Sequence, residues 1–148
     1  MVFSILLFAN AMPEARATDI NIGTNACQNG STVPNIGYSS IGVYTVGGPT
    51  AGFVTCNLPR APLSAGQTVG GFFVDGDNYN GGTAACTLYS INFNGAFLGS
   101  VSFTATEDHF DRYLGLPAAQ LPFYAYTYLV CSLSSDGNTV LRGVTSLQ

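Results

Sequence analysis

Four cysteines constrain the fold of this chain more than any other feature of its sequence: Cys27, Cys56, Cys86 and Cys131. None lies within the roughly two to four residues of another that a zinc-binding cysteine pair needs, so disulfide bonds are the favoured interpretation. We favour the pairing Cys27–Cys56, which would tie down the N-terminal segment, with Cys86–Cys131, which would join two long strands. Because disulfides persist in oxidising compartments, we expect a secreted protein, periplasmic or extracellular.

The first 17 residues resemble a secretory leader. Their apolar run is shorter than the roughly 20 residues that cross a bilayer, and Ala15 and Ala17 are small residues of the kind that a signal peptidase recognises. No Lys or Arg precedes the apolar run, and the alternative is a buried N-terminal element of the fold. We predict cleavage after Ala17 and one domain over residues 18–148, which contains no second stretch that could span a membrane.

Turn-forming residues recur along the chain and separate short runs of β-branched and aromatic residues. This pattern is typical of an all-β protein, and we predict a single antiparallel β-sandwich, jelly-roll-like or Ig-like, with two disulfides. Residues 100–106 alternate between hydroxyl and apolar side chains, as expected for a strand with one solvated face. Phe110–Leu121 alone has apolar residues near helical spacing. The expected strands are Tyr38–Val46, Gly52–Asn57, Thr68–Asp75, Ala84–Phe93, Phe97–Thr106, Phe123–Leu133 and Thr139–Thr145.

Charged residues are scarce: they make up 8% of the chain, against about 25% in ordinary globular domains. The net charge is −4, and the chain has no lysine. Beyond the predicted leader only Arg60, Arg112 and Arg142 are cationic, too few for a phosphate-binding stripe, so nucleic acid is excluded as a partner. A protein or a surface polysaccharide remains possible as a partner, and the protein could also self-associate.

The densest charged run, Glu107–Arg112, contains the chain's only histidine, His109. A histidine general base needs a nucleophile beside it, and no Gly-x-Ser-x-Gly motif supplies one. A single histidine also cannot form a two-histidine metal site. We therefore interpret this run as solvated surface, expect no enzyme, and predict that His109 is dispensable for folding and function.

The segment Asp75–Gly82 is rich in oxygen ligands, with Asp75 and Asp77 as its carboxylates. Calcium takes about six to eight oxygens, often from Asp, Asn and backbone carbonyls on a loop. The spacing does not match an EF-hand, because Tyr79 stands where a ligand should be. Asp, Asn and Gly are also good turn formers, so a plain turn is favoured over a calcium site at Asp75 and Asp77.

Four tyrosines form a stripe. Alternation along a strand over 123–133 places three of them on the face opposite Cys131, with Phe123 and Ala125 on the cysteine side, and the fourth lies opposite Cys86 on its own strand. If the disulfide faces the core, they form an outward patch that could stack on sugars or receive a protein. The alternative, which we favour, is that both faces are buried and the stripe is core. The tyrosines are Tyr89, Tyr124, Tyr126 and Tyr128.

Three short motifs carry a family resemblance: Cys56–Arg60, Cys86–Tyr89 and Tyr128–Leu133. Together they resemble a group of uncharacterised, small, secreted four-cysteine β-sandwich proteins of proteobacteria. The group often has an acidic residue after the Pro-Arg pair, where this chain has Ala61. The resemblance implies an extracytoplasmic β-sandwich and no activity.

Two functions fit these features. The first is a non-enzymatic interaction or structural protein, such as a filament or surface-layer subunit, and it agrees with the disulfides, the low charge and the missing catalytic set. The alternative is a carbohydrate-binding module that uses the tyrosine patch, with or without calcium. The absence of tryptophan counts against this alternative.

Overall fold

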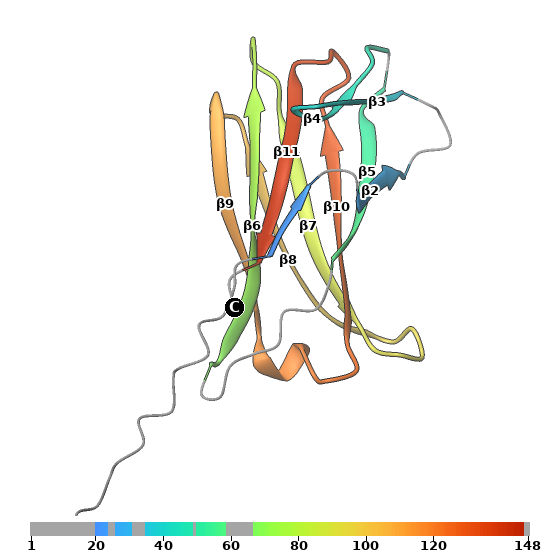
Figure 1. The fold of residues 1–148 in the computed structure, drawn as a ribbon, viewed down its shortest axis with the longest axis vertical. Helices are drawn as coiled ribbons and strands as arrows, with labels where there is room; N and C mark the ends of the chain where they lie inside the picture. Colours follow the sequence, from blue (N-terminus) through green and yellow to red (C-terminus); the bar gives the residue numbers. More distant parts are fainter. Residues whose placement is uncertain (1–19, 24–25, 31–34, 49, 59–66, 147–148) are drawn as a thin grey trace, which may run out of the picture.

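The computed structural model describes residues 20–23, 26–30, 35–48, 50–58 and 67–146. Over these residues two antiparallel sheets pack face to face as a β-sandwich, which confirms the fold class predicted from the sequence (Figure 1). The predicted leader lies outside the described residues. No helix in the described part is long and apolar enough to cross a membrane.

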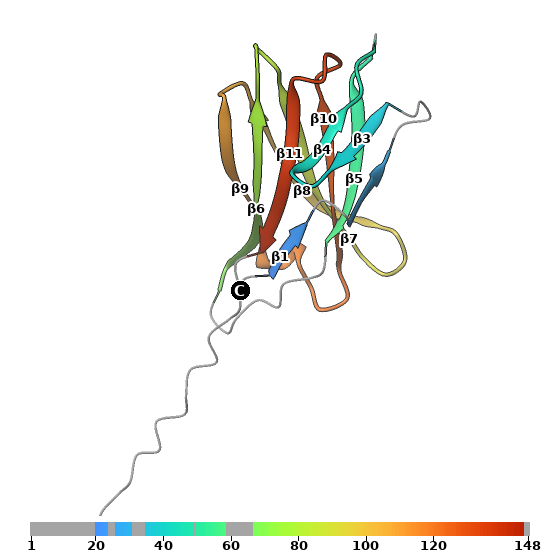
Figure 2. The ribbon, with the colours of Figure 1, turned by 45° about the horizontal axis from the view of Figure 1, so that its top comes forward.

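The first sheet, here called sheet A, has the strand order β3-β4-β11-β6-β9, and β1 also pairs with β11. The register of β11 shifts between Leu141 and Gly143, which places an irregularity at Arg142. β4 pairs with β11 before this point and β1 pairs with it beyond, so they share one edge of β11 (Figure 2). The strands are β1 (Ile20–Gly23), β3 (Ile36–Ser39), β4 (Gly42–Thr45), β6 (Val69–Asn78), β9 (His109–Pro117) and β11 (Thr139–Ser146).

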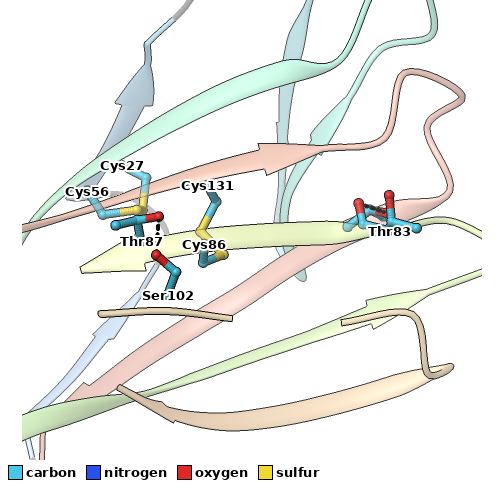
Figure 3. The surroundings of a disulfide bond; sticks show 8 residues. Cys27, Cys56, Thr83, Cys86, Thr87, Ser102 and Cys131 are labelled. Carbon is cyan, nitrogen blue, oxygen red and sulfur yellow. Dashed lines mark hydrogen bonds between the residues drawn. A yellow bond between two sulfur atoms is a disulfide. The ribbon is translucent and has the colours of Figure 1, made fainter. Parts of the chain in front are cut away.

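The second sheet, sheet B, has the order β2-β5-β10-β7-β8 and contains both disulfides. Cys27 lies directly opposite Cys56 and Cys86 directly opposite Cys131, with Cα–Cα distances of 3.9 and 4.1 Å (Figure 3). The predicted pairing is therefore confirmed. The strands are β2 (Cys27–Asn29), β5 (Gly52–Leu58), β7 (Ala84–Ile91), β8 (Phe97–Ala105) and β10 (Tyr126–Leu133).

The core lies between the two sheets and is built by alternation. On β10, for example, Leu129, Cys131 and Leu133 are fully buried, while the residues between them are partly exposed. All four cysteines belong to this core, so both disulfides lie on the inner face of sheet B. Each sheet therefore packs through one face and leaves its outer face to solvent. Sheet A contributes, among others, Val43, Phe72, Val74, Phe110, Leu114, Leu116, Leu141 and Val144.

Several expected elements differ from the structure. The single strand expected over Tyr38–Val46 is a hairpin, β3–β4, because the chain turns between Ser39 and Gly42, and the Ser39 hydroxyl accepts a hydrogen bond from the Ile41 N–H. The segment Phe110–Leu121, whose apolar residues have near-helical spacing, is strand β9 as far as Pro117 and then a 3₁₀ turn at Ala118–Gln120. Pairing along the whole of β6 outweighs the helical spacing of its apolar residues.

The strand expected from Phe123 begins instead at Tyr126. A turn closed by the Ala125 N–H donating to the Pro122 carbonyl (2.9 Å) precedes it. Phe123 and Tyr124 are therefore loop residues, and strand alternation does not determine the direction of their side chains.

Candidate functional site

The outer face of sheet B carries a stacked pair of tyrosines at its centre. Tyr128 on β10 lies opposite Tyr89 on β7, and their rings stack with centroids 5.0 Å apart and planes 13° from parallel. Asn57 flanks Tyr128 on one side and Ser100 flanks Tyr89 on the other, both of them exposed. One row across the sheet thus combines two rings with an amide and a hydroxyl.

Tyr126 and Tyr124 continue the aromatic surface toward one end of the sandwich. Tyr126 precedes the stacked pair on β10 and is 62% exposed. Tyr124, in the loop before β10, is 52% exposed and contacts the ring of Phe93 edge to face, with centroids 5.6 Å apart. The favoured prediction that this stripe is core is wrong, because sheet B packs through only one face. Phe123, predicted to face the core, is 88% exposed because it precedes the strand.

Beyond the tyrosines the outer face of sheet B combines hydroxyl groups with apolar side chains, among them Val130, Ala85 and the 45% exposed Phe53. The Thr87 and Ser102 hydroxyls share a hydrogen bond of 2.9 Å, drawn in Figure 3. Further along the strands, Ser132 lies in register with Ala85, and Ala85 with Thr104. The five strands of sheet B contain no Asp, Glu, Lys or Arg.

This combination suits a ligand that is apolar on one side and hydroxylated at its edges. Aromatic rings supply apolar contact area, and a phenol adds a polar tip. Hydroxyl and amide groups both donate and accept hydrogen bonds, so they can match other hydroxyls in either direction. A sugar ring, with C–H faces and peripheral hydroxyls, has these properties.

Sheet A is different: its outer face holds a buried carboxylate, Asp77, between two cationic or ionisable partners. His109 Nδ1 contacts Asp77 Oδ1, and Arg142 Nε donates to Asp77 Oδ2. Burial alone would raise the pKa of Asp77, but the hydrogen bonds from His109 and Arg142 outweigh it and lower the pKa. Arg142 also donates to the Tyr79 hydroxyl at 3.5 Å.

This contact corrects the interpretation of His109 as part of a merely solvated run. Its side chain is 80% exposed, yet its Nδ1 atom contacts a carboxylate that is 4% exposed. An open pocket beside it is lined by Asn78, Tyr79, Asn80, Asp108 and His109. This lining includes no serine, threonine or cysteine that His109 could activate as a nucleophile.

Asp75 and Asp77 lie on strand β6, so the predicted loop over Asp75–Gly82 is wrong for its first four residues. The strand continues because β6 pairs with β9 and β11 as far as Asp77 and Asn78. Asp75 lies opposite Asp111, and burial, followed by the Asp111 carboxylate, raises the pKa of Asp75.

The two aspartates therefore do not converge on one cation. Both carboxylate oxygens of Asp77 already contact His109 and Arg142. Within the described ranges no three His, Cys, Asp or Glu residues gather as a metal site. Calcium at Asp75 and Asp77 gains no support from this geometry.

Sequence reasoning did not find the partners of these aspartates. Arg142 is 65 residues from Asp77 in the chain and reaches it from the irregular point of β11. Asp111 meets Asp75 only through the register of β6 with β9, a strand that the sequence pattern did not reveal.

Comparison with known proteins identifies similar folds but no family to which this chain can be assigned. No protein-family model and no curated protein matches the chain. Among solved structures, a family 35 carbohydrate-binding module from Clostridium thermocellum is 13% identical with a TM-score of 0.50, over 89% of this chain and 99% of that one. A family 36 carbohydrate-binding module in complex with calcium and xylotriose is 18% identical (TM-score 0.46; 84% and 97%), and the xylan-binding module CBM15 is 12% identical (TM-score 0.43; 88% and 97%). At such identities the likeness shows the β-sandwich fold alone.

Proposed function

We propose that this protein is an extracytoplasmic carbohydrate-binding module whose site is the outer face of sheet B. The observation that carries the proposal is the set of exposed or partly exposed tyrosines: Tyr89, Tyr126 and Tyr128 on this face, and Tyr124 in the loop before β10. Hydroxyl and amide groups lie beside them on the same face, together with the apolar side chains of Val130, Ala85 and Phe53. Partly exposed aromatic rings beside groups that donate and accept hydrogen bonds form a binding surface for sugars.

Two further findings agree with this function. The fold is similar to that of the family 35 carbohydrate-binding module. Both disulfides are formed, and such bonds are consistent with the oxidising environment in which a secreted polysaccharide-binding protein works. The predicted leader over residues 1–17 would deliver the chain there.

Affinity electrophoresis in gels that contain polysaccharides tests the proposal. We expect the wild-type protein to be retarded by at least one glycan, and Tyr126→Ala to weaken that binding about tenfold, which corresponds to about 1.4 kcal/mol. Tyr113→Ala is the matched control, because Tyr113 is 44% exposed but belongs to β9 of sheet A. Equal losses in both variants, or no retardation by any glycan, would contradict the proposed site.

Calcium assistance is tested in the same gels. Because Asp77 is held by Arg142 and His109, we expect retardation and thermal stability to be unchanged between millimolar calcium and chelator. A rise in the melting temperature with calcium that disappears in Asp75→Ala with Asp77→Ala would restore the calcium prediction, since a ligand of the native state raises stability.

A second candidate, a protein-interaction or self-associating module, is supported by exposed phenylalanines at one end of the sandwich. Phe93 is 70% exposed and Phe97 64% exposed, both at the β7–β8 turn. Phe123, 88% exposed, lies in the loop between β9 and β10, which reaches the same end of the sandwich (Figure 1). Exposed apolar patches mark interaction sites. Sedimentation velocity tests it: a wild-type dimer that becomes monomeric in Phe97→Ser would favour this function.

A further inference from the structure

We propose that the outer face of sheet B binds an extended stretch of uncharged polysaccharide and discriminates against anionic glycans. This inference rests on the proposed function and names the class of ligand that the face accepts. It follows from where the described charges lie and from the length of the aromatic and hydroxyl surface.

Charge is segregated in this molecule. The strands of sheet B contain no charged residue. Every charged residue in the described part of the chain lies in sheet A or in the connections at the end of the sandwich where β6 ends and β11 begins (Figure 1). These residues are Asp75, Asp77, Glu107, Asp108, Asp111, Arg112, Asp136 and Arg142.

Both described arginines are also engaged on sheet A. Arg142 is paired with Asp77, and Arg112 forms an ion pair with Glu107. A carboxylate, sulfate or phosphate on a glycan bound to sheet B would therefore meet no described cation, although charged hydrogen bonds are the strong way to hold such groups. A neutral sugar loses nothing on this face, because hydroxyl and amide groups can satisfy its hydroxyls.

The face is long in the strand direction. The outward positions of β10 are Tyr126, Tyr128, Val130 and Ser132, a span of about 20 Å at roughly 3.3 Å per residue. The neighbouring strand β7 follows in register, with Tyr89 and then Thr87 beside it. An aromatic segment followed by a segment of hydroxyl and small apolar side chains thus continues well beyond the length of one sugar ring, which favours a chain over a terminal sugar.

Isothermal titration calorimetry with two kinds of probe tests the inference. The neutral probes are xylo-, manno- and cello-oligosaccharides of increasing length, and the anionic probes are polygalacturonate and alginate. We expect affinity for one neutral series to rise about tenfold or more from the disaccharide to the longer oligomers, and to change less than about twofold between about 0.05 and about 0.5 M salt.

Three results would overturn it. Anionic glycan binding that is lost in Tyr126→Ala would show that the face accepts charge. A disaccharide that binds as tightly as a long oligomer would show that the site is not extended. Absence of binding to every glycan would overturn the proposed function itself, and this inference with it.

A charge placed on the face provides a gain-of-function test. Ser100 is exposed on β8 and lies opposite Tyr89, so Ser100→Arg adds a cation beside the stacked pair. We expect this variant to acquire polygalacturonate binding that falls with salt, whereas Tyr113→Arg, on sheet A, acquires none. Wild-type protein that binds polygalacturonate as well as Ser100→Arg does would contradict the proposal.

Discussion

The two sheets of this sandwich are stabilised by different chemistry. Sheet B contains both disulfides and no charged residue in its strands, whereas sheet A holds the buried Asp77 with its partners on its outer face. The disulfides of sheet B lie in the core. Because the strands of sheet B contain no charged residue, no ion pair forms between side chains of these strands, and the tyrosines and hydroxyls there stay available to a ligand.

A second contrast lies within sheet A, between two aspartates on the same side of β6. Asp77 faces donors, and its pKa is lowered; Asp75 faces another carboxylate, Asp111, and its pKa is raised. The contributions of these two aspartates to the free energy of unfolding therefore change with pH in opposite directions. The predictions below test first the contrast between the sheets and then the contrast within sheet A.

The largest effect is expected from removal of the long-loop disulfide of sheet B. Cys86→Ala with Cys131→Ala opens a loop with a sequence separation of 45 residues. In the chain-entropy model such a cross-link contributes about 4 kcal/mol to the free energy of unfolding. Denaturant unfolding of the oxidised protein and of the variant measures the loss. A loss smaller than that caused by a substitution of Asp77, His109 or Arg142 would contradict the view that the disulfides are the main stabilising feature that distinguishes sheet B from sheet A.

The next largest effect is expected from Asp77→Asn. Hydrogen bonds to charged groups contribute roughly 1.5–3 kcal/mol, and this change weakens two of them, so we expect a loss of about 2 kcal/mol at neutral pH. Asp108→Asn, at an exposed position of the adjacent pocket, is the matched control and should change little.

The pH dependence of Asp77→Asn sharpens this prediction. Because the folded-state pKa of Asp77 is lowered, its contribution is present above the ordinary pKa of 3.8 and is lost as pH falls through the lower folded value. The difference in stability between wild type and Asp77→Asn should therefore shrink on acidification. A difference that stays constant down to the acid transition would exclude this mechanism.

The sequence was sufficient to predict the β-sandwich and its disulfides. The strands follow from local patterns along the chain, and four cysteines allow only a few pairings. Alternation along residues such as Val101 and Phe103, together with turn residues between short apolar runs, defines strands with one buried face. The widely spaced cysteines excluded zinc pairs and left few pairings, of which the correct one joined strands. Helical spacing misled at Phe110–Leu121, because an edge strand can also carry its apolar residues at such intervals.

The tyrosine surface and the Asp77 contacts were harder to predict from the sequence, because both depend on strand register and on packing between distant segments. Nothing near Tyr89 in sequence reveals that its ring stacks on Tyr128, and exposure of the stripe follows only once sheet B is known to pack through one face. The contact between Asp77 and Arg142 likewise requires the pairing of β6 with β11. Single-sequence patterns do not specify which strands become neighbours.

A smaller effect is expected from His109→Ala. Its imidazole contacts Asp77, but most of its side chain is exposed, so we expect a loss of about 0.5–1 kcal/mol, less than for Asp77→Asn. Glycan binding should be unchanged, because His109 belongs to sheet A. Thermal unfolding and affinity electrophoresis of the same preparation check both points, and weakened glycan binding with intact stability would place the site on sheet A instead.

The smallest effect, and the one of opposite sign, is expected from Asp75→Asn. Like charges directly opposite each other across two strands are destabilising. Because Asp75 is only partly buried and Asp111 is exposed, solvent screens the repulsion, and removing the Asp75 carboxylate should stabilise the protein by a few tenths of a kcal/mol at neutral pH. Since the folded-state pKa of Asp75 is raised, the favourable protonated form contributes fully below 3.8, and that contribution is lost as pH rises through the folded value. The variant should therefore gain over wild type as pH rises, whereas Asp77→Asn loses. Asp111→Asn should gain less than Asp75→Asn, because it removes the repulsion but leaves the partly buried Asp75 carboxylate in place. The double variant should gain no more than Asp75→Asn alone, because that substitution already removes the repulsion. Additive gains in the double variant would show that the two carboxylates do not interact.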